Sequence, residues 1–117
     1  VVICDRFIDS TIAYQVHGKK VDINFINNIH RKILQDIKPN VVFVLKVSKN
    51  SSRKRLKKRK FKNRYDNFPQ SFYNKAQKSF IKLAKNKKNY FILNSSLNDD
   101  SLEDKIFNII NKYLNIK

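Results

Sequence analysis

The feature that most restricts the fold is the unbroken apolar run of residues 1–4, V-V-I-C, which ends at Asp5 and Arg6. Such a run is typical of a strand buried on both faces, as in a parallel sheet covered by helices. In open α/β sheets, ligands bind beyond the carboxyl ends of the strands, which is where Asp5 and Arg6 would stand. A guanidinium matches two phosphate oxygens at once, and a carboxylate can hold magnesium through water or orient an attacking oxygen. The run therefore predicts an α/β fold with phosphoryl chemistry at these two residues.

The rest of the chain alternates helical and strand patterns, which indicates an α/β architecture with right-handed crossovers. The predicted elements are a helix over residues 10–16 that ends near Gly18, a helix from Asp22 to about Ile37, a strand over residues 41–47, a helix from Pro69 to Ala84, a strand over residues 90–93 and a helix from Ser101 to Tyr113. The apolar stripes of the last three helices predict that each has a side facing the core.

The chain has 26 Lys and Arg residues against nine Asp and Glu, a net charge of +17. That charge alone predicts a nucleic acid or another polyanion as partner. Twenty of the 26 basic residues are lysines, and this bias towards Lys, Asn and Ile is typical of an AT-rich genome. We therefore interpret the charge as mainly a solvated lysine surface, and expect no specific nucleic acid as partner.

Cysteine usage and hydropathy predict the compartment. The single cysteine, Cys4, lies in an apolar run and is expected to be a small buried side chain. There is no disulfide or zinc pattern, no membrane-length apolar stretch and no leader, so we expect a cytoplasmic protein without a membrane partner.

Residues 5–15, D-R-F-I-D-S-T-I-A-Y-Q, resemble the D-R-Y/F/H-x-x-S-T/N-x-A-Y-Q signature of bacterial thymidylate kinases, which phosphorylate dTMP to dTDP with ATP. The resemblance implies that Arg6 grips the acceptor phosphate and that Asp5 supports it or the magnesium, through water. It implies that Thr11 and Gln15 face thymine, and that Tyr14 packs on the deoxyribose. It further implies dTMP and ATP as partners and Mg²⁺ as cofactor, and it is compatible with a homodimer. For D-R alone, the alternative is an Asp that caps the next helix beside a solvated arginine.

Residues 46–64 contain eleven basic residues and no acidic one. Within them, K-R-L-K-K-R-K-F-K-N-R-Y-D is similar to the family pattern K-R-x-x-x-R-x-x-x-D-R-x-E, so the region of about residues 48–68 resembles the family's lid. The resemblance implies that Arg55, Arg59 and Arg64 bind ATP, with Arg59 and Arg64 catalytic, because cations that close over the phosphates stabilise charge and exclude water. The second half of the tract is expected to be mobile, since it has little to pack with. The alternative is a basic tract that reflects composition alone.

Four residues depart from the family's pattern, one of them Phe80, which stands where a tyrosine is usual. Lys46 and Asn94 stand where aspartates are usual, and Gln77 stands where an arginine is usual. Lys46 reverses a charge near the nucleotide, and either reaches an ATP phosphate or is solvated. The loss of an arginine at Gln77 is expected to weaken lid closure or substrate contact, unless a neighbouring lysine compensates.

No G-x-x-x-x-G-K-S/T loop occurs in the chain, and its single glycine could not build one. The expected fold is therefore a P-loop-kinase-like three-layer parallel sheet with helices on both faces, incomplete because the first two strands are missing. Residues 1–117 are expected to be a partial thymidylate kinase domain that is inactive alone. One alternative is a basic nucleic-acid-binding module, although its tract would interleave aromatic residues and only Phe61 is present. The other is a different nucleotide or deoxynucleoside kinase, which would lack the S-T-x-A-Y-Q continuation.

Overall fold

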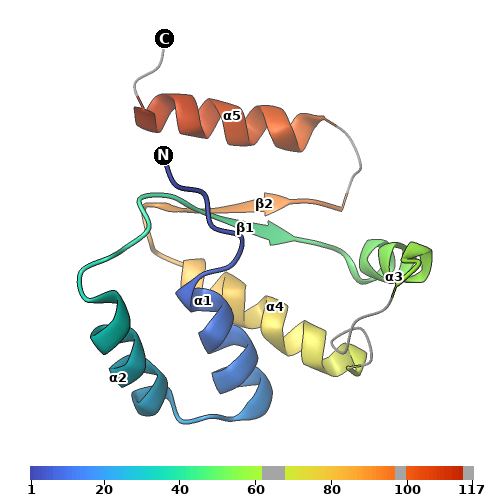
Figure 1. Cartoon of the computed structure of the whole chain (residues 1–117). Coiled ribbons are helices and arrows are strands. Elements are labelled where there is room, and N and C mark those ends of the chain that lie inside the picture. Colours follow the sequence, from blue (N-terminus) through green and yellow to red (C-terminus); the bar gives the residue numbers. More distant parts are fainter. Residues whose placement is uncertain (62–67, 97–99, 115–117) are drawn as a thin grey trace.

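The computed structural model describes residues 1–61, 68–96 and 100–114, and shows a small parallel sheet with helices on both faces (Figure 1). The described elements, in chain order, are α1 (Ile8–Thr11), the π-helix η1 (Ile12–Gly18), α2 (Ile23–Leu34), β1 (Val42–Lys46), α3 (Lys49–Lys58), α4 (Gln70–Ala84), β2 (Tyr90–Asn94) and α5 (Ser101–Leu114). In these ranges the sheet consists of β1 and β2, with Val42 opposite Tyr90 and Lys46 opposite Asn94. The predicted α/β class with parallel strands is confirmed.

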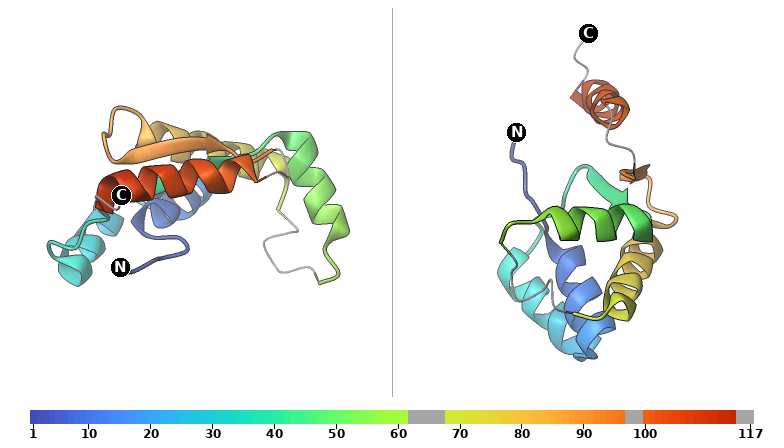
Figure 2. Two further views of the ribbon diagram at one scale, coloured as in Figure 1. Left: turned by 90° about the horizontal axis from the view of Figure 1, so that it is seen from above. Right: turned by 90° about the vertical axis from the view of Figure 1, so that its right-hand side faces the viewer.

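The two faces of the sheet are covered differently. Helices α4, α1 and η1 lie below the sheet in Figure 1, whereas α5 lies alone on the opposite side, which the end-on view in Figure 2 shows clearly. An edge-on ring contact between Phe91 of β2 and Tyr113 of α5 joins them, with 6.3 Å between the ring centroids. None of the residues of α5 is buried. The predicted core-facing stripe is confirmed in part: Leu102, Ile106, Ile109 and Ile110 are half-buried, whereas Tyr113 is exposed.

Residues 1–4 do not form the predicted strand. Val1, Val2 and Ile3 are almost fully exposed, and Cys4 is exposed rather than buried. A strand is stabilised by hydrogen bonds to a neighbouring strand, and in the described part of the chain β1 and β2 pair only with each other. The apolar run thus has no partner strand among these residues, which explains why a sequence typical of a buried strand is solvated here.

Helix α2 begins as predicted and ends early. The Asp22 carboxylate accepts a hydrogen bond from the Phe25 N–H at 2.8 Å, so the predicted N-cap is confirmed. The helix ends at Leu34 because Gln35 has a left-handed φ of 48°. Only Ile26 of this helix is buried, and Ile33 and Ile37 are about two-thirds exposed, so the predicted core face to Ile37 is wrong in its second half.

The most closely packed region lies between α4 and η1. Phe72, Ala76 and Ala84 of the predicted α4 stripe are buried, and Ala13 of η1 is fully buried. Ser79 is buried as well, which the apolar stripe did not predict. No helix in the described ranges combines the length and the apolarity needed to cross a bilayer.

Gly18 is required by close packing rather than by a left-handed backbone. A Cβ at this position would lie 2.6 Å from Cε2 of Phe72, a buried ring. The left-handed residue after η1 is Lys20, with φ 62°. We expect Gly18→Ala to lower the free energy of unfolding by about 1–3 kcal/mol, since the ring must move within a packed core. Chemical denaturation of the chain checks this, and His17→Ala, at an exposed neighbour, should change stability by less than about 0.5 kcal/mol.

Candidate active site

The D-R motif lies at the turn that leads into α1. Asp5 and Arg6 are exposed in a bend, and Arg6 has a φ of 67°, a left-handed conformation that costs a residue with a Cβ free energy. The Arg6 guanidinium carbon lies 5.1 Å from the centroid of the Tyr14 ring, within cation–π range. The turn thus brings together two residues that are eight positions apart. The family resemblance assigns both of them to the binding of dTMP.

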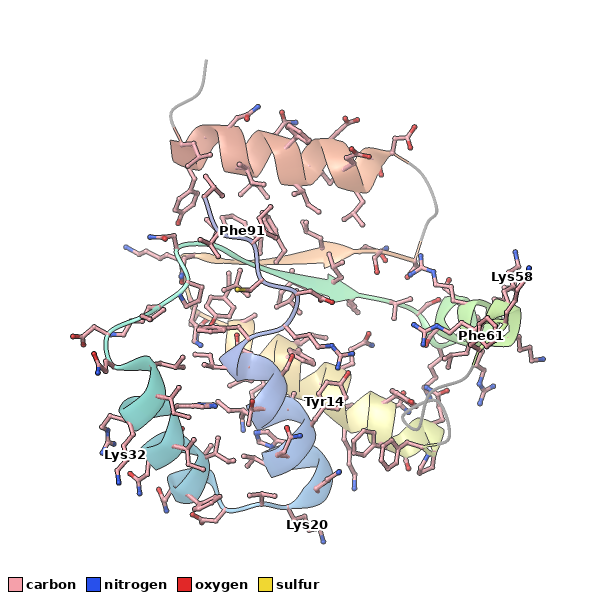
Figure 3. All side chains as sticks on the ribbon, in the orientation of Figure 1. Tyr14, Lys20, Lys32, Lys58, Phe61 and Phe91 are labelled. Carbon is pink, nitrogen blue, oxygen red and sulfur yellow. The ribbon has the colours of Figure 1, made fainter. Side chains whose placement is uncertain are left out.

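Tyr14 is held from the other side by α4. Its ring centroid lies 5.9 Å from that of Phe72 and 5.9 Å from that of Phe80, which it meets edge-on. In Figure 3, Tyr14 lies between η1 and α4. Phe80 stands where the family pattern has a tyrosine, and a ring contact of this kind requires no hydroxyl. Packing on α4 therefore fixes the ring on which the Arg6 side chain rests.

Thr11 and Gln15 are half-buried, at the end of α1 and within η1. Because η1 is a π-helix, its hydrogen bonds span one more residue than those of an α-helix, and the side-chain directions differ from α-helical spacing. The Gln15 carbonyl accepts the Val21 N–H at 3.0 Å, which ties the end of η1 to the next loop. No signal in the sequence predicted the π-helix, and such turns are frequent at functional sites.

Asp9 connects α1 to the sheet, a contact that sequence reasoning missed. It is 9% exposed, and its carboxylate faces the hydroxyl of Tyr90 at the start of β2. Burial and the neighbouring Asp9 carboxylate raise the pKa of Tyr90 above its usual value. The Tyr90 hydroxyl therefore stays protonated at neutral pH beside the helix that follows the D-R motif.

The first half of the basic tract is a helix, α3. Ser48 caps it by accepting the Ser51 N–H at 3.2 Å, and Arg55 donates to the Ser95 carbonyl at 2.5 Å. Arg59 follows the last residue of α3 and is exposed. The second half of the tract, for which mobility was expected, is helical as far as Lys58, and residues 62–67, Arg64 among them, lie outside the described residues. Figure 3 places Lys58 and Phe61 at the end of the molecule that α3 forms.

The structure brings two of the departures from the family's pattern together. Lys46 and Asn94 are opposite one another in the sheet register, at its carboxyl edge, and both are exposed. The Asn94 side chain accepts the Ser96 N–H at 3.0 Å. A cation and a neutral amide thus occupy adjacent places where the family pattern has two carboxylates, so this edge is more positive than that pattern implies.

The candidate residues form two groups on separate elements. Arg6, Thr11, Tyr14 and Gln15 belong to α1, η1 and the turn before them, whereas Arg55 and Arg59 belong to α3 and its end. Across the described ranges, no three His, Cys, Asp or Glu side chains are placed to hold a metal ion. An open pocket of about 470 Å³ between β2 and α5 is lined by Phe91, Ile109, Lys112 and Tyr113, and includes none of the candidate residues.

Comparison with known proteins agrees with this arrangement. A family model described as thymidylate kinase matches residues 1–106. Thymidylate kinase of Wolbachia pipientis wMel is 44% identical over 85 residues, which cover 72% of this chain and 41% of the relative. Thymidylate kinase of Mesomycoplasma hyopneumoniae strain J is 32% identical over 115 residues, 97% of this chain and 54% of the relative. The crystal structure of thymidylate kinase from Ehrlichia chaffeensis matches 99% of this chain and 51% of its own, with a TM-score of 0.64 and 26% identity. The chain therefore spans about half the length of these relatives.

Proposed function

The chain belongs to the thymidylate kinase family, and we propose that it supplies the acceptor-binding turn and the lid of an enzyme that transfers the γ-phosphoryl group of ATP to dTMP, giving dTDP. Residues 1–117 form, in this proposal, one part of the kinase domain. The observation that carries it is the Arg6–Tyr14 pair, which stands inside the family's D-R-x-x-x-S-T-x-A-Y-Q pattern.

Arg6 is suited to the acceptor phosphate. Its guanidinium is exposed, and the Tyr14 ring restricts its position without occupying its N–H donors in the ring plane. A planar fork that is already oriented loses less entropy when it grips two phosphate oxygens. Tyr14, held by Phe72 and Phe80, would offer a flat surface to the deoxyribose, and Thr11 and Gln15 would hydrogen-bond the thymine edge.

The donor side requires groups beyond this chain. ATP would be bound by Arg55, Arg59 and Arg64 together with a phosphate-binding loop, which the sequence does not contain. Asp5 supplies one exposed carboxylate, which would hold Mg²⁺ through water, with the other oxygen ligands coming from water and the ATP phosphates. Magnesium would neutralise charge on the ATP phosphates. The cytoplasm, where nucleotides are made, is the location we propose.

The substrate preference tests this proposal. We define the joined kinase as this chain preceded by the phosphate-loop half of the Wolbachia pipientis relative. We expect it to phosphorylate dTMP with a kcat/KM at least about tenfold higher than for dUMP, dCMP or AMP, because a pocket built for one base and sugar leaves its polar groups unpaired when another occupies it. A coupled assay of ADP formation over the four monophosphates measures this.

Two results would count against the proposal. Equal rates on all four monophosphates would remove the specificity for dTMP and favour a general nucleotide kinase. Activity of the 117-residue chain alone would contradict the assignment of the ATP phosphates to a loop outside it. The control is the joined kinase with Arg6→Ala, which should lose most of its activity with dTMP.

A further inference from the structure

The turn from β1 into α3 is held by side chains from two distant parts of the chain. The Val47 N–H donates to Oε1 of Gln77 on α4 at 3.0 Å. The next backbone N–H, that of Ser48, donates to Oγ of Ser96 after β2 at 2.9 Å. These acceptors are 30 and 48 residues away in sequence. Tertiary contacts, rather than local ones, therefore set the direction in which the chain leaves β1.

The hydrogen bond at Val47 requires an acceptor at position 77. The bond is part-buried, so water would only partly replace a lost acceptor. Removal of the acceptor would therefore destabilise the folded chain. Glutamine and glutamate offer a side-chain oxygen there, whereas arginine and lysine have only donors. The arginine usual at this place in the family pattern would set a second donor against the Val47 N–H. Gln77 therefore has a role that an arginine at this position could not fill, because it accepts a hydrogen bond.

Helix α3 is tied to the loop after β2 at two further points. Oγ of Ser51 donates to the Ser96 carbonyl at 3.2 Å, and Arg55 donates to the Ser95 carbonyl. Ser95 in turn lies against the end of β1, because its N–H donates to the Lys46 carbonyl at 2.8 Å. These bonds form only when α3 leaves β1 in one direction. Figure 1 shows that direction, with α3 beyond the end of the β1 arrow.

From these contacts we propose that Gln77 is a positioning residue, which fixes the direction of α3 by accepting the Val47 N–H, and so sets where the arginines of α3 and its end stand. The inference rests on the function proposed above, because it concerns the arginines assigned to ATP. It also reverses the expectation from the sequence, in which the change from arginine to Gln77 weakens the lid. In this chain, a return to arginine is the damaging change.

Hydrogen exchange of the Val47 amide in the 117-residue chain tests the acceptor role without any assay of activity. We expect Gln77→Arg and Gln77→Ala to speed this exchange about tenfold or more, and Gln77→Glu to keep it within about threefold of the parent, since only the last retains an acceptor. Gln70→Arg adds the same charge to the same helix, seven residues away, and should leave the exchange unchanged. Unchanged exchange in Gln77→Arg would overturn the proposal. If Gln77→Arg does not fold, Gln77→Glu decides, because loss of protection there overturns the role as well.

Kinetics of the joined kinase test the consequence for ATP. We expect Gln77→Arg to raise the KM for ATP about tenfold while the KM for dTMP stays within about twofold, because α3 and not the D-R turn is displaced. Gln77→Glu should keep the KM for ATP close to that of the parent, because glutamate retains an acceptor. A KM that rose only because the protein was less stable would not depend on the acceptor in this way. An equal rise of both KM values would overturn the positioning role. An inactive joined kinase would count against the proposed function, whereas the Val47 exchange rate would still decide for or against Gln77 as the acceptor.

Discussion

In the joined kinase, Arg6→Lys is expected to lower kcat/KM for dTMP by about thirtyfold or more, which corresponds to about 2 kcal/mol or more of transition-state stabilisation. Lysine keeps the charge but has neither the planar fork that grips two phosphate oxygens nor the face that rests on the Tyr14 ring. Steady-state kinetics with varied dTMP measures the effect. Wild-type kinetics in Arg6→Lys would reassign Arg6 as a solvated residue at the entrance to α1.

A second variant separates activity from stability at the same position. Arg6 has a left-handed φ of 67°, and glycine adopts that backbone without steric cost. The relief of strain in Arg6→Gly offsets the removal of the cation–π interaction and the greater freedom of the unfolded chain, so we expect the free energy of unfolding to stay within about 1 kcal/mol of the parent. Activity should fall by about a hundredfold or more. Equal losses of stability and activity would make Arg6 a structural residue.

The parts of the fold that the sequence predicted depend on local patterns. The strands over residues 41–47 and 90–93 are found as Val42–Lys46 and Tyr90–Asn94, each marked by a short run of β-branched and aromatic side chains. The Asp22 cap needs only the Phe25 N–H three residues away. The family itself was evident because residues 5–15 are contiguous, so their spacing is visible without the fold.

The parts that could not be predicted depend on partners distant in sequence. The Asp9–Tyr90 contact and the Val47–Gln77 bond join elements whose relative placement only the folded chain defines. The same limit explains why residues 1–4 were predicted as a buried strand. Their composition suits a sheet interior, but a strand also needs a neighbour, and that neighbour is a property of the fold and not of the four residues.

In the candidate site, too, contacts between residues close in sequence were easier to predict than contacts between distant ones. Arg6 and Tyr14 meet because both lie on one short helical segment or the turn that enters it. The described contact of Arg55, by contrast, is the Ser95 carbonyl, which is 40 residues away. Alignment with a charged pattern identifies which arginines stand on a lid, and does not distinguish one that reaches the nucleotide from one that fixes the helix. Arg59 is exposed directly after α3, and the resemblance assigns it to catalysis, so we use it to test the lid.

The largest expected difference between the two interpretations of the basic tract is at Arg59. If the tract is an ATP lid, its effect depends on a few placed arginines, so Arg59→Ala in the joined kinase should lower kcat at least about tenfold. Arg53→Ala and Lys57→Ala remove one positive charge each from exposed positions of α3 that the family pattern leaves unassigned, and should change kcat by less than about twofold. Turnover measured at saturating ATP and dTMP distinguishes the three variants.

If the tract is a nucleic-acid footprint, the three variants should instead behave alike. Each removed charge would weaken binding of a labelled oligonucleotide by a similar factor and reduce the salt slope by about one for each phosphate that is no longer neutralised. We expect binding that is weak, indifferent to sequence and abolished at physiological salt, because lysines spread over a surface attract a polyanion without a shape that holds it. Titration of single- and double-stranded oligonucleotides at low and physiological ionic strength measures this. Sub-micromolar affinity at physiological salt, with equal losses in all three variants, would make nucleic-acid binding the main role of the basic tract.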